Sequence, residues 1–166
     1  MLWSAAGGFG DPLERDPAKV RADVENGDVS VEAAREIYGV VIDDSVETRK
    51  LREQKRLGRI GKASGTRLEG KEKLRATENL TIRDARWCCA KCATDLGAVS
   101  ANYKAGCVRN DLPITASNPI VGDPRRFIDP VPQFRQFCCP GCGLAIENEI
   151  AVAEDPVLHD VQLATK

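Results

Sequence analysis

The sequence is poor in the residues from which small proteins usually build a core. Only 5% of its 166 residues are aromatic, and it has one histidine and one methionine. Fourteen glycines and nine prolines predict many turns and a modest amount of regular structure. The length allows one ordinary domain or two small ones. With so lean a core, we expect a bound metal or a partner protein to contribute to stability.

Long apolar runs are also absent. No stretch approaches the roughly 18–20 uninterrupted apolar residues that a membrane-spanning helix needs. The mildly apolar start, Met1 to Ala6, has no preceding basic region and is followed at once by glycines and Asp11, which is unlike a signal peptide. We therefore expect a soluble, cytoplasmic protein with no membrane partner.

The chain has no overall surplus of charge of one sign, because 24 Lys and Arg face 25 Asp and Glu. This balance is not typical of a nucleic-acid-binding protein. Locally, however, residues 49–75 hold eleven basic and three acidic residues, a net charge of +8. We expect Gly58, Gly61, Gly65 and Gly70 to interrupt any helix there. The segment is interpreted as a linker or a docked extended arm, with a solvated connector as the alternative.

The first part of the chain, residues 1–56, is expected to form an extended arm with short helices. Asp16 can cap a helix that begins at Pro17, and Ser30 can cap a second one that reaches Tyr38. Each helix offers only a narrow apolar stripe. Neither is expected to persist in water without a surface to pack against.

The last part, residues 79–166, follows a basic linker at residues 57–78 and alternates short β-like runs with turns. Strand-like runs occur at 81–82, 86–88, 134–138 and 146–152. A proline-rich excursion, residues 111–132, cannot be a central strand or a long helix. The predicted fold class is α+β, with short N-terminal helices, a basic linker and a small β-rich, zinc-ribbon-like C-terminal domain.

Two Cys-x-x-Cys pairs give the strongest chemical signal, and they are Cys89 with Cys92 and Cys139 with Cys142. Structural zinc prefers a closed tetrahedron of four thiolates, and two intervening residues let one tight turn present both sulfurs. The 46 residues between the pairs are no obstacle, because the entropy of loop closure grows slowly with length. Structural zinc contributes roughly 10–16 kcal/mol of apparent binding energy in small peptides. We predict these four cysteines as ligands of a structural zinc ion.

The two pairs differ in turn chemistry. In the second, Pro140 fixes a turn after the first ligand, while Gly141 and Gly143 permit positive φ. The first pair has Ala93 in the position that corresponds to Gly143. Its turn is expected to form at a slightly greater steric cost.

Other interpretations of the cysteines stay open. A redox dithiol favours a single pair at the start of a helix in a βαβ setting, and ordinary buried thiols are a further alternative. Four thiolates would also accept iron. Cys88 and Cys138 are expected to point away from the metal, because strand neighbours face opposite sides. We assign Cys107 no role.

The histidine and the rest of the sequence offer no second site. His159, the only histidine, is expected to be a packed or interface residue rather than a ligand. No serine elbow, Walker-type phosphate loop or convincing carboxylate pair occurs. We therefore assign no catalytic and no cofactor-binding residue to this chain.

Two stretches resemble known families. Residues 5 to about 56, which include Gly7–Pro17 and Asp28–Val41, resemble the C-terminal tail of the hydantoinase B/oxoprolinase large subunits. Residues from about 83 to 161, which include both cysteine pairs and Pro156–Asp160, are similar to the small gamma subunit of acetone carboxylase.

These resemblances imply a small accessory subunit of an ATP-dependent, biotin-independent ketone carboxylase. They imply large hydantoinase A/B-like partner subunits in a hetero-oligomer, which hold ATP and magnesium and lack the tail that this chain supplies in trans. Acetophenone carboxylase, which forms benzoylacetate from acetophenone and bicarbonate, is the implied type. The alternatives are an acetone carboxylase or hydantoinase-type accessory subunit, and a zinc-ribbon module that binds nucleic acid through the +8 segment.

Overall fold

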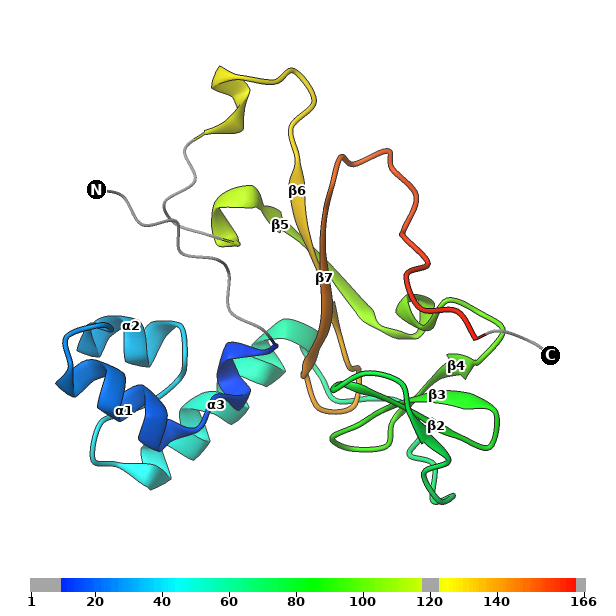
Figure 1. Cartoon of the computed structure of the whole chain (residues 1–166), viewed down its shortest axis with the longest axis horizontal. Coiled ribbons are helices and arrows are strands. Elements are labelled where there is room, and N and C mark those ends of the chain that lie inside the picture. Colours follow the sequence, from blue (N-terminus) through cyan, green and yellow to red (C-terminus); the bar gives the residue numbers. More distant parts are fainter. Residues whose placement is uncertain (1–9, 118–122, 164–166) are drawn as a thin grey trace.

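The computed structural model describes residues 10–117 and 123–163. Helices α1 to α3 lie together on one side of the molecule, and two small antiparallel sheets form the other side (Figure 1). This arrangement confirms the predicted α+β class. The glycine-rich run Gly7–Phe9 and Pro119 lie outside the described residues.

The predicted helix caps are confirmed. After a short 3-10 helix, η1 (Pro12–Glu14), helix α1 spans Pro17–Glu25 and α2 spans Val31–Glu36. The Asp16 carboxylate accepts the backbone N–H of Ala18, and the Ser30 hydroxyl accepts that of Ala33. Each cap thus satisfies a backbone donor that has no partner inside the helix.

A third helix, α3 (Ser45–Ile60), was not predicted. Asp44 caps it by accepting the N–H groups of Val46 and Glu47. The helix passes through Gly58 and ends at Gly61, where φ is +68°. The expectation that Gly58 would interrupt a helix is therefore wrong. A glycine inside a helix costs only about 1 kcal/mol relative to alanine, and the cap and the contacts of α3 with the rest of the chain outweigh that cost.

The helices share a small core of their own. Val20 of α1, Ala34 of α2 and Val40 of the following loop are buried together. Arg52 of α3 is also buried, and its guanidinium donates to the backbone carbonyls of Tyr38 and Arg15. The sequence predicted that α1 and α2 need another surface to pack against. Helix α3 provides part of it, because Arg52 binds the backbone of Arg15 and Tyr38, which flank these two helices.

The first sheet has the strand order β1-β2-β3-β4 and the second β5-β6-β7, with all neighbours antiparallel. The predicted strand-like runs overlap β2, β3, β6 and β7. Strand β5 extends to Pro113, inside the proline-rich excursion, and it is an edge strand rather than a central one. The bounds are β1 Leu74–Arg75, β2 Leu80–Arg83, β3 Arg86–Cys89, β4 Asp95–Ala98, β5 Val108–Pro113, β6 Gln133–Cys138 and β7 Ala145–Ala151. Three 3-10 helices connect them: η2 Tyr103–Gly106, η3 Ile114–Ala116 and η4 Pro124–Arg126.

The main core lies between the first sheet and the start of β7. Trp87 and Tyr103 are both buried and meet edge to face, with ring centroids 6.0 Å apart. The indole N–H of Trp87 donates to the carbonyl of Ala101 over 3.1 Å, as a buried indole usually requires. The same cluster includes the sulfur-bearing residues Cys89 and Cys139. The hydrophobic core and the cysteine pairs are therefore one packed unit.

The C-terminal segment is anchored on the second sheet by two buried cations. Arg135 of β6 has a fully buried side chain and pairs with Glu149 of β7 over 3.0 Å. Lys104 of η2 bridges Glu149, over 3.1 Å, and Asp160, over 3.3 Å. Arg135 also donates to backbone carbonyls of the C-terminal segment, those of Val152, Ala153 and Asp155.

Candidate metal centre

The first cysteine turn closes at the end of β3. The N–H of Ala93 donates to the carbonyl of Cys89, and the N–H of Cys89 donates to the carbonyl of Thr94, each over 2.9 Å. Ala93 has φ of +59°, a left-handed conformation that costs an L-residue roughly 1–2 kcal/mol. The strained turn that the sequence predicted at Ala93 is confirmed.

The second cysteine turn, at the end of β6, repeats the same pattern. The N–H of Gly143 donates to the carbonyl of Cys139 over 2.8 Å, and the N–H of Cys139 donates to the carbonyl of Leu144 over 2.9 Å. Gly143 has φ of +68°. The two turns thus present their sulfurs in equivalent ways from the ends of two different sheets.

Glycine is required in the second turn for a further reason. A Cβ on Gly143 would lie 2.3 Å from the backbone oxygen of Arg56 in α3, and one on Gly141 would lie 2.0 Å from the hydroxyl of Thr94. Real Cβ atoms do not approach other atoms this closely. The second turn is therefore packed directly against α3 on one side and against the first turn on the other.

The four predicted ligands converge. The sulfurs of Cys89, Cys92, Cys139 and Cys142 all lie within 4.8 Å of one another. The distance from Cys89 to Cys142 is 3.8 Å, and that from Cys92 to Cys139 is 3.6 Å. A tetrahedron with metal–sulfur bonds of about 2.3 Å has edges of about 3.8 Å. The donor set and its spacing therefore fit a metal ion of the size and preference of zinc.

The environment of the sulfurs also suits a metal. Cys89 and Cys139 are buried, while Cys92 and Cys142 are partly buried. The hydrogen bond with Cys139 is the largest influence on both neighbouring thiols, but in opposite directions. It raises the pKa of Cys89 and lowers the pKa of Cys92. The four close thiols therefore do not lose their protons independently of one another. A divalent cation would replace those protons and stabilise all four thiolates.

The remaining thiols lie outside this cluster, as predicted. Cys88 and Cys138 are fully buried, and the sulfur of Cys138 receives a long hydrogen bond, 3.7 Å, from the side chain of Asn110. Burial raises the pKa of Cys138 to about 11 and that of Cys107 to about 12. These thiols therefore stay protonated at neutral pH.

His159 is not part of the cluster. It lies in the anchored C-terminal segment, and its Nε2 atom is buried without a hydrogen-bond partner among the residues that the structure describes. Within residues 10–117 and 123–163, the four cysteines are the only group of three or more cysteine, histidine or acidic side chains close enough to share a metal ion.

The sequence did not reveal how the helices are joined to the metal centre. The carboxylate of Asp11 is fully buried and accepts the backbone N–H groups of Leu13 and Ala145, each over 3.0 Å. It also pairs with Arg59 of α3 over 2.6 Å, and Arg59 donates to the carbonyl of Gly143 over 3.0 Å. Burial alone would raise the pKa of Asp11, but Arg59 and the two N–H groups hold it below its usual value. This junction connects η1, α3 and the second turn.

A second link joins η1 to the first turn. Glu14 pairs with Lys91, which lies between Cys89 and Cys92, and with Arg56 of α3. Apart from the family resemblance carried by Gly7–Pro17, the local signal in this region is an acidic residue before a proline, Asp11-Pro12, which is typical of a short capped helix. That signal gives no hint of the long-range partners.

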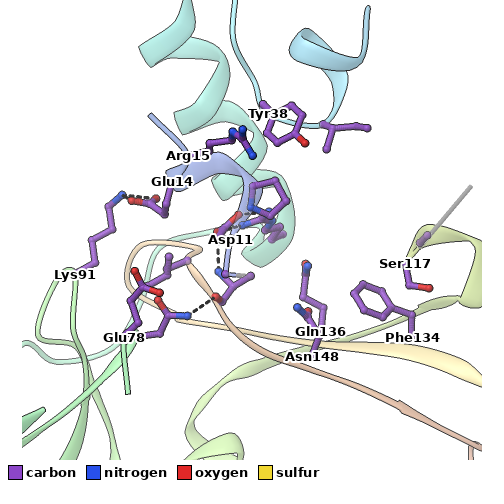
Figure 2. A pocket seen from close by; sticks show the side chains of 18 of the residues that line it. Asp11, Glu14, Arg15, Tyr38, Glu78, Lys91, Ser117, Phe134, Gln136 and Asn148 are labelled. Carbon is purple, nitrogen blue, oxygen red and sulfur yellow. Dashed lines mark hydrogen bonds and ion pairs between the residues drawn. The ribbon is translucent and has the colours of Figure 1, made fainter. Parts of the chain in front are cut away.

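An open groove of about 1290 Å³ lies where the two halves of the molecule meet. Figure 2 shows Asp11 at its centre, the pair of Glu14 and Lys91 on one side, and Phe134 and Gln136 of β6 on the other. Its walls come from η1, the first turn and the second sheet. The groove is thus a feature of the junction and contains no sulfur.

Comparison with known proteins identifies the second half of the chain. The family model of the acetone carboxylase gamma subunit matches residues 67–165. The chain belongs to this family. The matched range contains all four clustered cysteines, both sheets and the anchored C-terminal segment, whereas the three helices lie outside it.

Two curated relatives match a shorter stretch. The beta subunit of caprolactamase from Pseudomonas jessenii is 65% identical over 37 residues, which are 22% of this chain and 6% of that protein. The B subunit of a putative D-/L-hydantoinase from Pseudomonas sp. (strain NS671) is 51% identical over 47 residues, 28% of this chain and 8% of that protein. The chain therefore spans less than a tenth of the length of each of these relatives.

None of the helices among the described residues combines the length and the apolar character that crossing a membrane requires.

Proposed function

We propose that this chain is a small metal-binding structural subunit of a multisubunit, ATP-dependent, biotin-independent ketone carboxylase. The observation that carries the proposal is the combination within one chain. The same chain holds a domain of the acetone carboxylase gamma family and a short stretch that is 51–65% identical to parts of much larger hydantoinase and caprolactamase subunits.

The arrangement that we propose has three parts. Residues 1–56 form an arm that packs on a large hydantoinase A/B-like subunit. Residues 57–78 form a basic linker between this arm and the metal-binding domain, residues 79–166. Catalysis, ATP and magnesium belong to the large subunits, since no catalytic group is assigned to this chain. The proposed reaction is the ATP-dependent carboxylation of acetophenone by bicarbonate to benzoylacetate.

The metal that we propose is zinc, held by Cys89, Cys92, Cys139 and Cys142. Four sulfurs at tetrahedral spacing leave no open coordination position, which is typical of structural rather than catalytic zinc. When bound, the ion would tie together two turns that are 46 residues apart in the sequence. The chain's own contribution is to hold both turns through their backbone hydrogen bonds.

Reconstitution of the complex tests the function. The chain is co-expressed with hydantoinase A-type and B-type large subunits of the same organism, and the purified assembly is assayed for ketone-dependent ATP hydrolysis and for a carboxylated product. We expect stable assembly and hydrolysis that depends on acetophenone. Assembly with hydrolysis only of hydantoins or lactams would refute the ketone assignment, and no assembly would refute the subunit role.

Point variants on the surface test the docking of the arm. Val31 and Ile37 are 61% and 49% exposed, although both are aliphatic and lie at the ends of α2. Replacing them together by lysine is expected to weaken assembly, because apolar surface would no longer be buried against a partner. Leu158, which is 62% exposed on the C-terminal segment, provides the matched control as Leu158→Lys. Equal assembly of both variants would contradict the proposed arm.

A further inference from the structure

The structure divides the cations of the basic segment, residues 49–75, into two sets. Four of them, on the inner side of α3, are used within the chain: Arg52, Lys55, Arg56 and Arg59 donate to backbone carbonyls or acidic side chains of the helical half and the second turn. Six others have exposed side chains that form no hydrogen bond or ion pair with the residues that the structure describes: Arg49, Lys50, Lys62, Arg67, Lys71 and Lys73. The eleventh, Arg75, also has a partner within the chain, since it pairs with Glu72 over 3.9 Å. The local charge is therefore only partly explained by internal contacts.

Four of these six cations lie on one stretch, residues 62–73, which we call the strap. Its backbone is fixed on both cysteine turns: the N–H of Ser64 donates to the carbonyl of Pro140, and that of Leu68 donates to the carbonyl of Ala93. The carbonyl of Thr66 accepts the N–H of Asp95 in return, over 2.9 Å. Residues 62–73 are therefore docked on the rest of the chain rather than being a solvated connector.

A fixed backbone gives the strap's side chains a defined direction. Lys62, Arg67, Lys71 and Lys73 are all exposed, while the backbone of the strap bonds to the two turns at Ser64 and Leu68 and to β2 at Lys73. Of the strap's two acidic side chains, Glu72 pairs with Arg75 and Arg83, and Glu69 forms no ion pair with the described residues. Neither of them neutralises the four exposed cations through an ion pair. Because the strap is already ordered, binding there does not have to overcome the entropy of fixing a loose segment.

We propose that the outward face of the strap docks on an acidic surface of the large partner subunit. The inference rests on the proposed function, and it adds the location and the chemistry of one contact. An acidic protein surface complements four exposed cations carried on an ordered backbone. Contacts between groups of like charge in other orientations would disfavour wrong docking.

A protein partner fits these residues better than a nucleic acid. Outside residues 49–75 the chain carries a net charge of −9, which would repel a long polyanion. The strap contains no aromatic residue, whereas binding of single strands relies on base stacking against aromatic rings. An acidic patch on a folded subunit is short enough to contact the strap alone.

The physical role of such a contact is mainly to guide association. Lysine is depleted from the desolvated centres of interfaces and common at their wetter rims. Charges at a rim raise the association rate and its salt dependence more than they slow dissociation. The strap is therefore expected to steer the chain onto its partner, while apolar contacts of the arm hold it there.

The test is a charge reversal measured by kinetics on the full chain. Lys62→Glu with Arg67→Glu changes two exposed cations whose side chains form no hydrogen bond or ion pair with the described residues. Association with the purified large subunits is expected to slow about tenfold at 50 mM salt and to approach the wild-type rate at 500 mM, with dissociation changed less than about twofold. Metal content and far-ultraviolet circular dichroism of the variant should match those of the wild type.

The matched control is Arg125→Glu with Arg126→Glu in η4. This 3-10 helix precedes the start of β6, whereas the second cysteine turn follows the end of β6. It makes the same change in net charge, and its association rate should stay within about twofold of the wild type. Unchanged association of the strap variant, equal slowing by the control, or tight salt-sensitive binding of the wild-type chain to a 20-base-pair DNA duplex would each overturn the inference. Failure of the wild-type chain to assemble would overturn the proposed function as well, whereas normal assembly with an unaffected strap variant overturns only the strap.

Discussion

Removal of the buried carboxylate at the junction is expected to be among the most destabilising single changes in the chain. In Asp11→Ala, the guanidinium of Arg59, whose side chain is only 18% exposed, loses its partner. The N–H groups of Leu13 and Ala145 lose their acceptor as well. Breaking one side of a buried ion pair costs about 3–5 kcal/mol, and each orphaned buried donor contributes about 1–3 kcal/mol. We expect a loss of at least about 3–5 kcal/mol in the free energy of unfolding.

The assay is urea unfolding of the metal-loaded chain, combined with hydrogen exchange at Ala145 and Leu13. Both amides should exchange faster in the variant, because the carboxylate that protects them is gone. The matched control is Asp123→Ala. Asp123 likewise caps a 3-10 helix that begins with proline and pairs with an arginine, Arg125, but it does so in the solvent. A loss for Asp11→Ala no larger than that for Asp123→Ala would refute the role of the junction.

The same residue predicts a pH dependence. The pKa of Asp11 is lower in the folded chain than its usual value of 3.8, so the unfolded chain binds its proton more readily. The stabilisation by Asp11 is therefore fully present above about pH 4 and is lost as the pH falls through the depressed folded value. The stability difference between the wild type and Asp11→Asn should shrink over that acidic range. A constant difference across it would show that the carboxylate charge contributes nothing.

The remaining predictions concern the metal centre and the C-terminal anchor. Ala93→Gly should raise the free energy of unfolding by about 1 kcal/mol, because it relieves a left-handed alanine. Gly143→Ala should lower the free energy of unfolding by more than that, because the new Cβ would clash with α3. Changes of equal size in the two variants would show that the backbone φ, and not the clash with α3, sets the cost at Gly143. Cys92→Ser should abolish stoichiometric zinc in elemental analysis while Cys107→Ser retains it, and zinc retained by the first variant would exclude the four-sulfur site. Arg135→Met should unpair Glu149 from one cation and speed proteolysis within residues 152–160, which lose the carbonyl contacts; unchanged cleavage would contradict the anchor.

The sequence determined the parts of the molecule that depend on near neighbours. Caps at Asp16 and Ser30 and the two cysteine turns follow from contacts within about five residues. The strands beside the turns were predicted from their local residue pattern. Backbone conformation at Ala93 was predictable for the same reason, because its position in the turn matches that of Gly143. The fold class and the four clustered sulfurs could therefore be named without a structure.

Only the tertiary structure decided how those parts are joined. The side-chain pattern gave no reason to pair Asp11 with Arg59, 48 residues away, or to divide the basic segment into inner cations that link the two halves and outer ones on the strap. The difference between Gly143 and Ala93 likewise depends on the backbone of Arg56, which only the packed chain brings within reach. Such contacts are selected by burial and by the satisfaction of distant backbone groups, and these are properties of the whole fold rather than of any short stretch of sequence.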